Sequence, residues 1–87
     1  GGSTVLDVRT PQEFGAGHLR GARNLALGDD FAAAVGALPR AGTYIVYCAS
    51  GNRSRQAGEI MSGLGFSQVI DAGGLSDLAA VGAEVVT

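Results

Sequence analysis

Short apolar runs alternate along the chain with segments in which apolar residues recur at helical spacing. Residues 4–8 (T-V-L-D-V) and 43–47 (T-Y-I-V-Y) are apolar runs of strand length. The second run is β-branched, aromatic and apolar on both faces, which is typical of a central strand covered by helices on each side. Shorter runs predict strands at 22–25, parallel to the first, at 69–70 and at 84–86. The alternation predicts an α/β domain with a mostly parallel central sheet and helices on both faces.

A capping box follows the first predicted strand. Thr10 is the expected N-cap, Pro11 occupies the first helical position, and Glu13 is placed to accept from the N-cap backbone N–H. Gly15 and Gly17 come soon afterwards, so we expect this helix to be short.

Three further segments have helical patterns. Asp29 or Asp30 is placed to cap a helix with an apolar stripe at Phe31, Ala34, Val35 and Leu38. A second helix is expected to begin near Ser54, with its stripe at Ala57, Ile60, Met61 and Leu64 and with Gly65 just beyond its end. After Gly73-Gly74, a last helical stretch has Leu75, Leu78 and Ala79 on one face.

The length and the cysteine count limit what the chain can be. Its 87 residues predict a single domain, residues 1–87, near the lower limit for unaided stability. One cysteine excludes an internal disulfide and a cysteine zinc cluster, and it favours a reducing compartment such as the cytoplasm. The apolar runs are far shorter than the roughly 20 residues of a membrane span. The start, Gly1-Gly2-Ser3, is consistent with a cloning scar, a processed end or an excision from a longer protein.

The charged residues exclude several kinds of chemistry. The net charge of −2 gives no reason to expect nucleic acid as a partner. All six basic residues are arginine, which excludes Schiff-base and P-loop lysines. A single histidine excludes a three-histidine metal site. These residues exclude much of the usual enzyme chemistry, and the short apolar runs give no reason to expect a membrane partner.

The position of Cys48 is the strongest functional signal. This cysteine ends the predicted central strand, at the sheet edge where α/β proteins bind ligands. The residues after it are small, and Gly51 can adopt a positive φ, so the backbone can curl with its N–H groups pointing inward. Such a ring at a helix N-terminus binds anions. The predicted anion-binding loop consists of Ala49, Ser50, Gly51, Asn52, Arg53 and Ser54.

A thiol at the base of such a ring becomes a better nucleophile at neutral pH. A free cysteine titrates near ~8.5, and helix N-termini or arginines lower this value to about 3.5–7.5. Arg53 is placed to add positive charge or to be held by a carboxylate. The alternative is that Cys48 is a small buried hydrophobic residue, as many free cysteines are. Its place at a strand end, before a glycine-containing loop and an amphipathic helix, favours the nucleophile.

Residues 48–54 (C-A-S-G-N-R-S) resemble the C-x-x-G-x-R-S active-site loop of the single-domain rhodaneses, the thiosulfate sulfurtransferase family. The likeness runs in register from Thr4 to Leu78. It includes L-D-V-R at 6–9, E-F at 13–14, G-H-L-R-G-A at 17–22 for the family's G-H-I-P-G-A, N-L at 24–25, L-G-F at 64–66 and G-G at 73–74.

The chain also departs from the family pattern. Members usually carry a short strand and helix before L-D-V-R, so the N-terminal part of the domain looks shortened here. Arg20 replaces a common proline, and Leu75 and Leu78 lie in a region that often carries tryptophan. These last differences concern packing and leave the loop chemistry in place.

Several residues are candidates for the shell around the loop. Asp7 and Arg9 should emerge at the same sheet edge as Cys48, and the resemblance places them in that shell. Asp7 is either an acid–base group or, as we favour, a carboxylate that fixes an arginine. Glu13 is favoured as a cap or as a partner of Arg53. His18 suggests a Cys–His dyad, but glycines nearby on both sides indicate a turn, and the resemblance implies a structural histidine. Arg55 and Tyr47 are expected on a helix surface and in a strand, with the pocket mouth as the alternative for each.

The resemblance implies sulfur transfer through a Cys48 persulfide. The implied partners are a thiosulfate-like anion as donor and a thiol or protein as acceptor, and neither a metal nor an organic cofactor is implied. A non-catalytic or sulfur-relay module that binds protein partners is the first alternative. A related cysteine phosphatase or arsenate reductase is the second. The C-x₅-R loop of cysteine phosphatases places its arginine six positions after the cysteine, whereas Arg53 follows Cys48 by five, which favours sulfur chemistry.

Overall fold

The computed structural model describes residues 3–87, and Gly1 and Gly2, with the question of their origin, lie outside this range. The elements in chain order are β1 (Thr4–Asp7), α1 (Pro11–Ala16), β2 (His18–Leu19), β3 (Arg23–Asn24), α2 (Phe31–Gly36), β4 (Thr43–Cys48), α3 (Asn52–Gly63), β5 (Gln68–Gly74), α4 (Leu75–Ala80) and β6 (Val85–Val86).

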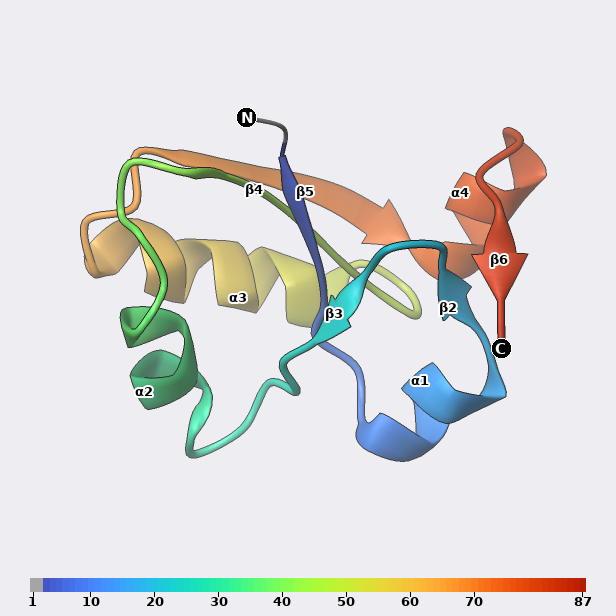
Figure 1. Cartoon of the computed structure of the whole chain (residues 1–87), viewed down its shortest axis with the longest axis horizontal. Helices are drawn as coiled ribbons and strands as arrows, with labels where there is room; N and C mark the ends of the chain where they lie inside the picture. The colour runs from blue at the N-terminus through green and yellow to red at the C-terminus, as the bar shows by residue number, and fades with distance from the viewer. Residues whose placement is uncertain (1–2) are drawn as a thin grey trace.

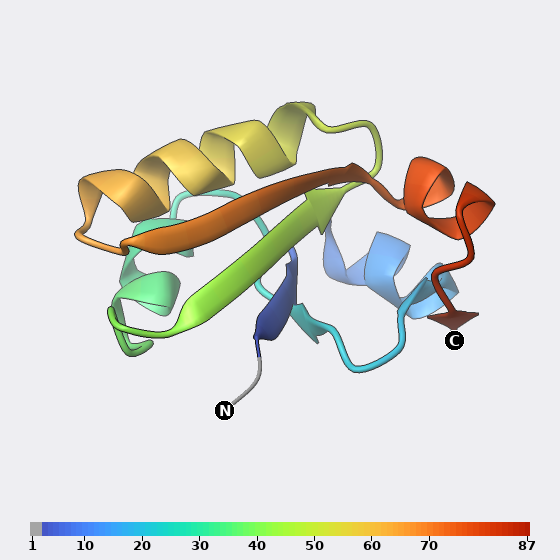
Figure 2. The same ribbon diagram turned by 90° about the horizontal axis from the view of Figure 1, so that it is seen from above.

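Four strands form the main sheet in the order β3-β1-β4-β5, and every neighbouring pair is parallel. The strand predicted at 43–47 is therefore internal, with β1 and β5 on either side. Because parallel strands end at a common edge, Asp7 and Cys48 both emerge there. The predicted α/β domain with a mostly parallel sheet and helices around it is confirmed (Figures 1 and 2).

The hydrophobic core lies between the sheet and the helices α2 and α3. Alternate residues of β4 enter it, namely Tyr44, Val46 and Cys48. Their neighbours in β1 point to the same side, because side chains alternate along a strand. The core consists of Leu6, Val8, Phe31, Val35, Tyr44, Val46, Cys48, Ala57, Met61 and Phe66. In Figure 1, α1, α4 and the β2–β6 pair lie together at the end of the molecule away from α2.

The helices confirm the capping box and correct two apolar stripes. Thr10 and Glu13 make both hydrogen bonds of the box at the start of α1. In α3, Ala57 and Met61 are buried, but Ile60 and Leu64 are each 37% exposed, so only half of the predicted stripe faces the core. The helix begins at Asn52, two residues earlier than expected, and its end is confirmed by Gly65, whose φ is +99°.

The second helix, α2, is shorter than its pattern predicted. It ends at Gly36, so Leu38 lies beyond the helix, although its side chain still packs against the core. Ala34 is exposed, and Asp30, although it is the N-cap, makes no capping hydrogen bond with the described residues. A helix of six residues presents one narrow stripe, here Phe31 and Val35.

A small second sheet was only half predicted. The strand expected at 84–86 exists as β6, and it pairs antiparallel with β2. His18 was expected in a turn, which is wrong: it lies in β2 and pairs with Val86, and Leu19 beside it pairs with Val85. A two-residue strand has no periodicity that a sequence can display, so tertiary pairing alone defines it.

Candidate active site

The candidate nucleophile, Cys48, is the last residue of β4 and is fully buried. The chain then makes a tight turn and enters α3 at Asn52. Gly51 is the residue before the helix and has a φ of +100°, which glycine adopts without steric strain. This turn brings the Gly51 N–H, directly before a twelve-residue helix, to the Cys48 sulfur.

The sulfur of Cys48 lies among hydrogen-bond donors. The Gly51 N–H donates to Sγ at 2.9 Å, and the Ser54 Oγ lies 3.6 Å from it. Burial acts to raise the pKa of the thiol. Hydrogen bonds from the Ser54 side chain and from the backbone of Ser54, Gly51 and Ser50 outweigh burial, so the pKa of Cys48 lies below its ordinary value. The thiolate is therefore more readily formed here than in a free cysteine.

The two ends of the loop are buried, and its middle is exposed. Cys48 and Ser54 are buried, whereas the residues between them reach the surface or are half-buried. The exposed loop residues are Ala49, Ser50 and Asn52, and the half-buried ones are Gly51 and Arg53. The outer side of the loop therefore faces solvent.

The loop rests directly on the end of β5. A Cβ added to Gly74 would overlap the Ala49 carbonyl oxygen and would come within 3.2 Å of the Ser50 Cα. Only glycine allows this close approach of two backbones. The end of β5 therefore supports the loop from below.

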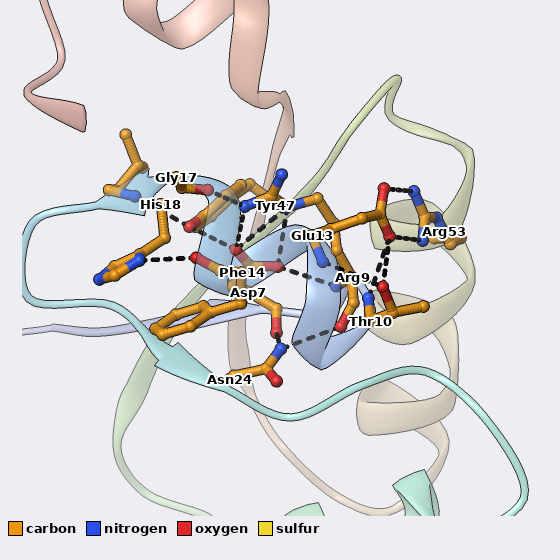
Figure 3. Close-up of polar contacts among 11 residues, drawn as sticks. Asp7, Arg9, Thr10, Glu13, Phe14, Gly17, His18, Asn24, Tyr47 and Arg53 are labelled. Atoms are coloured by element: carbon orange, nitrogen blue, oxygen red, sulfur yellow. Dashed lines mark hydrogen bonds and ion pairs between the residues drawn. The ribbon is translucent and has the colours of Figure 1, made fainter. Parts of the chain in front are cut away.

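Arg53 is held by a carboxylate, as predicted, and the carboxylate is that of Glu13. The two groups meet at two points, Nη1 to Oε1 at 2.7 Å and Nη2 to Oε2 at 3.0 Å (Figure 3). The hydrogen bond from Arg53, followed by that from the Thr10 N–H, lowers the pKa of Glu13 to about 2. The hydrogen bond to Glu13 also raises the pKa of Arg53. Glu13 thus caps α1 and anchors the first turn of α3.

Asp7 holds Arg9, and the interpretation as a structural carboxylate is the one that its contacts support. The Arg9 side chain donates from Nε and Nη2 to both oxygens of Asp7 at 2.7 to 3.1 Å, and Nη2 also donates to the Gly17 carbonyl. The hydrogen bond to Asp7 raises the pKa of Arg9. This buried pair fixes the backbone at the carboxyl end of β1.

Tyr47 completes this cluster rather than the pocket mouth. Its hydroxyl donates to Asp7 Oδ2 at 2.7 Å and accepts from the Leu19 N–H at 3.0 Å (Figure 3). Burial is the first cause that raises the pKa of Tyr47 to about 12. Its side chain is fully buried and neutral over the physiological range.

His18 and Arg55 occupy the non-catalytic places that were considered for them. The His18 ring stacks on Phe14 with centroids 3.7 Å apart, and its Nδ1 lies 2.9 Å from the Phe14 carbonyl oxygen. Arg55 is on the surface of α3, where it pairs with Glu59 at 3.6 Å. The Cys–His dyad, the less favoured alternative, is not supported by these contacts.

Sequence reasoning missed one group beside the site, the carboxylate of Asp71 in β5. Its Oδ1 accepts from the Ser54 hydroxyl at 2.6 Å and from the Gly73 N–H at 3.0 Å. Ser54 in turn contacts Cys48. The available signal was weak: Asp71 is a polar residue two positions before the Gly-Gly pair that follows a short apolar run.

Two kinds of feature are absent from the described part of the chain. Residues 3–87 contain no group of three or more histidine, cysteine, aspartate or glutamate side chains arranged to hold a metal ion. Within the same residues, the helices are too short or too polar to span a membrane.

The fold and the site together define a class: a small α/β domain in which the cysteine at the end of an internal strand lies beneath a loop that leads into a helix. The sequence model of the family described as the rhodanese-like domain matches residues 1–80. This chain belongs to the rhodanese-like domain family.

Curated relatives agree with this assignment. Thiosulfate sulfurtransferase PspE of Escherichia coli strain K12 is 40% identical over 75 residues, which cover 85% of this chain and 72% of PspE. Thiosulfate sulfurtransferase GlpE of Ectopseudomonas mendocina is 39% identical over 71 residues, which cover 78% of this chain and 62% of GlpE. The chain thus spans less than two thirds of the length of the latter relative.

Solved structures match the whole fold. A rhodanese-like domain of the Alr3790 protein from Anabaena has a TM-score of 0.91 at 27% identity, with 99% of this chain and 100% of that chain covered. A rhodanese from E. coli, solved with anions, has a TM-score of 0.82 at 34% identity, with 99% of each chain covered.

Proposed function

We propose that this rhodanese-type sulfurtransferase moves a sulfane sulfur from a thiosulfate-like donor to a thiophilic acceptor through a persulfide on Cys48. The observation that carries the proposal is the 2.9 Å hydrogen bond from the Gly51 N–H to the Cys48 sulfur at the start of α3. The names of the relatives PspE and GlpE, both thiosulfate sulfurtransferases, support thiosulfate as the donor class.

The first half-reaction exchanges one sulfur–sulfur bond for another. The Cys48 thiolate attacks the outer sulfur of thiosulfate, and the bond between the two thiosulfate sulfurs breaks. Its electron pair leaves on sulfite, and Cys48–S–S⁻ retains the single negative charge of the thiolate. The sulfur arrives at the sulfane oxidation level and itself oxidises the cysteine sulfur to the persulfide level, so no external oxidant is required.

The loop is suited to stabilise the anion in each form. Backbone N–H groups of Ser50, Gly51 and Ser54 favour negative charge on the cysteine sulfur, and the same groups would favour it on the terminal sulfur of the persulfide. We place the donor at the solvent-facing side of the loop, near Ala49, Ser50 and Asn52. Arg53, held by Glu13, contributes its charge and fixes the loop.

The second half-reaction returns the thiolate. A nucleophilic acceptor attacks the outer sulfur, and the electron pair of the persulfide bond returns to Cys48. Cyanide serves as the acceptor in an assay, with thiocyanate as the product, and a small thiol or a protein thiol is our proposal for the cell. The persulfide itself carries the sulfur, so the route requires neither a metal nor an organic cofactor.

The chief alternative is a sulfur-relay or partner-binding module that uses the same domain. An acidic thiol beneath donor N–H groups favours catalysis or relay over a purely binding role. The two catalytic possibilities differ in the donor, because a relay domain would receive its sulfur from a protein persulfide and would react slowly with free thiosulfate.

Intact-protein mass spectrometry tests the proposal. Thiosulfate should add the mass of one sulfur atom to the wild-type protein, and cyanide should remove it with release of thiocyanate. The Cys48→Ala variant should show neither change. Persistence of thiocyanate formation in Cys48→Ala would refute the mechanism, and a wild-type protein that accepts sulfur only from a protein persulfide would favour the relay.

A further inference from the structure

The hydroxyl group of Ser54 has three partners within reach. Its Oγ lies 2.6 Å from Asp71 Oδ1, 3.1 Å from the Gly51 carbonyl oxygen and 3.6 Å from the Cys48 sulfur. A serine hydroxyl has a single proton to donate, although its oxygen can accept two hydrogen bonds. The Gly51 carbonyl and the Asp71 carboxylate therefore compete for that proton, and the Cys48 sulfur competes with them only as a thiolate.

The carboxylate of Asp71 is the strongest of these acceptors. It makes the shortest of the three contacts, and hydrogen bonds to carboxylate acceptors are about twice as strong as those to neutral ones. The Ser54 proton is accordingly directed to Asp71. The lone pairs of the Ser54 oxygen are then available to the Cys48 sulfur.

This arrangement suits a thiol better than a thiolate. A Cys48 S–H can donate to the Ser54 oxygen, and the chain Cys48–Ser54–Asp71 is then complete. A thiolate needs a donor instead, so the Ser54 hydroxyl must turn away from Asp71 to serve it. The Gly51 N–H donates to the sulfur in either state.

We propose that Asp71 is a positioning residue for Cys48: by accepting the Ser54 hydroxyl proton, its carboxylate favours the thiol form of Cys48 over the thiolate. The loop N–H groups act in the opposite direction, and Asp71 limits their effect. The advantage of this limit for catalysis rests on the proposed function. A thiolate of very low basicity is a poor nucleophile, and attack is fastest when the thiol titrates near the ambient pH.

The carboxylate is itself held in place. Asp71 Oδ1 also accepts the Gly73 N–H at 3.0 Å, in the same turn whose next residue, Gly74, supports the loop. The interaction with Ser54 thus joins α3 to the end of β5 at the point where the loop rests. The substitution Asp71→Asn retains a side-chain oxygen that can accept from the Gly73 N–H.

The other charged groups around the site are paired or lie at its edge. On α3, Arg53 pairs with Glu13, and Arg55 pairs with Glu59. Arg55 and Glu59 line an open groove that Asp71 also lines. At the end of β1, Asp7 pairs with Arg9, and the Tyr47 hydroxyl donates to Asp7. Asp77 lies exposed in the first turn of α4.

The test compares Asp71→Asn with Glu59→Gln, which removes the same charge from the same groove. The probe is iodoacetamide, and the readout is the pH dependence of Cys48 alkylation followed by intact mass. Asp71→Asn should lower the midpoint by about half a unit or more, so that alkylation below the midpoint accelerates about threefold. Glu59→Gln should leave the midpoint unchanged.

Two further variants show whether Asp71 acts through Ser54. Ser54→Ala should raise the midpoint, because the thiolate loses a donor. Adding Asp71→Asn to Ser54→Ala should then change nothing more. Asp71→Ser, which also frees the hydroxyl, should lower the midpoint as Asp71→Asn does, and it replaces that variant if the latter is misfolded by circular dichroism.

Three outcomes would overturn the proposal. These are an unchanged or higher midpoint in Asp71→Asn, an equal decrease in Glu59→Gln, and a decrease by Asp71→Asn that persists in the Ser54→Ala background. The alkylation midpoint requires no sulfur donor. The midpoint is therefore measured independently of the persulfide assay, and it can still be determined if the sulfurtransferase proposal fails.

Discussion

Glu13 and Arg53, forty residues apart in the sequence, form a two-point ion pair with N–O distances of 2.7 and 3.0 Å. The same Glu13 carboxylate accepts the Thr10 N–H at 3.0 Å. One side chain therefore closes the capping box of α1 and anchors the first turn of α3, and it connects the loop over Cys48 to the end of β1.

Replacing Glu13 with glutamine should destabilise the protein in a pH-dependent way. The pKa of Glu13 is about 2 in the folded protein against an ordinary value of 4.5. A lowered pKa stabilises the fold above pH 4.5, and this contribution is lost as the pH falls towards 2. The side chains are about one-third exposed, so screening limits the expected loss at neutral pH to about 0.5–1 kcal/mol.

Urea unfolding of both proteins over that pH range measures this effect. Glutamine preserves the capping hydrogen bond, so the difference reports the charge. Glu84→Gln, which removes a well-exposed ion pair with Arg20, is the control and should change little. A Glu13→Gln difference that stays constant as the pH falls would contradict the explanation.

Gly74→Ala should impair the chemistry of the loop more than it impairs folding. The added methyl group overlaps the Ala49 carbonyl oxygen, so the loop backbone must move. Displacement of reacting groups by ~1 Å can lower a rate about a hundredfold, and we expect persulfide formation to slow by about tenfold or more.

Stopped-flow measurement of persulfide formation on the folded fraction provides the readout. Gly63→Ala adds the same methyl group at the end of α3, where it would meet no described atom within 4 Å. This control should keep its rate and gain up to about 1 kcal/mol of stability from helix propensity. Equal rates for the two variants would show that the loop tolerates the displacement.

Tyr47→Phe should destabilise the fold by about 1–3 kcal/mol. The hydroxyl connects Asp7 to the Leu19 N–H, and its removal leaves a partly buried N–H without its partner. Tyr44→Phe removes a single hydrogen bond to the Pro39 carbonyl and should have the smaller effect, about 1 kcal/mol. Chemical denaturation of both variants decides the order, and the reverse order would refute the role of Tyr47 as the connecting group.

The unaltered protein should be a poor phosphatase. Arg53 follows Cys48 by five positions, and a C-x₅-R loop has one residue more, so the ring here has one N–H fewer and is narrower. A phosphoryl group must seat three oxygens on ring donors, whereas thiosulfate presents one sulfur at its tip. Turnover of thiosulfate should be far faster than hydrolysis of an aryl phosphate, and insertion of a residue after Ser50 should reduce the difference between the two rates. Efficient phosphatase activity without the insertion would contradict the assignment.

Local sequence patterns were enough to predict much of the fold and the position of Cys48. The apolar run at 43–47, the capping box at Thr10 and the terminating Gly65 are short-range features, because backbone sterics and neighbouring hydrogen bonds decide them within a few residues. The position of Cys48 between a buried strand and a glycine-containing turn could be predicted in the same way. These predictions required no knowledge of distant contacts.

The tertiary structure alone decided which groups meet. Arg53 had two carboxylates within plausible reach, Asp7 and Glu13, and the choice depends on where α1 lies over the sheet edge. The pairing of β2 with β6 and the exposure of Ile60 depend in the same way on elements far along the chain.

Asp71 illustrates the reason most clearly. Its side chain acts at Ser54, seventeen residues away, and the two meet only because β5 lies beside β4 and α3 packs on both. A hydrogen bond depends on tenths of an ångström, whereas a sequence pattern specifies only which face of an element a residue occupies. The sequence therefore indicated the proposed nucleophile and its loop, and the packing of β5 against α3 determined which carboxylate contacts Ser54.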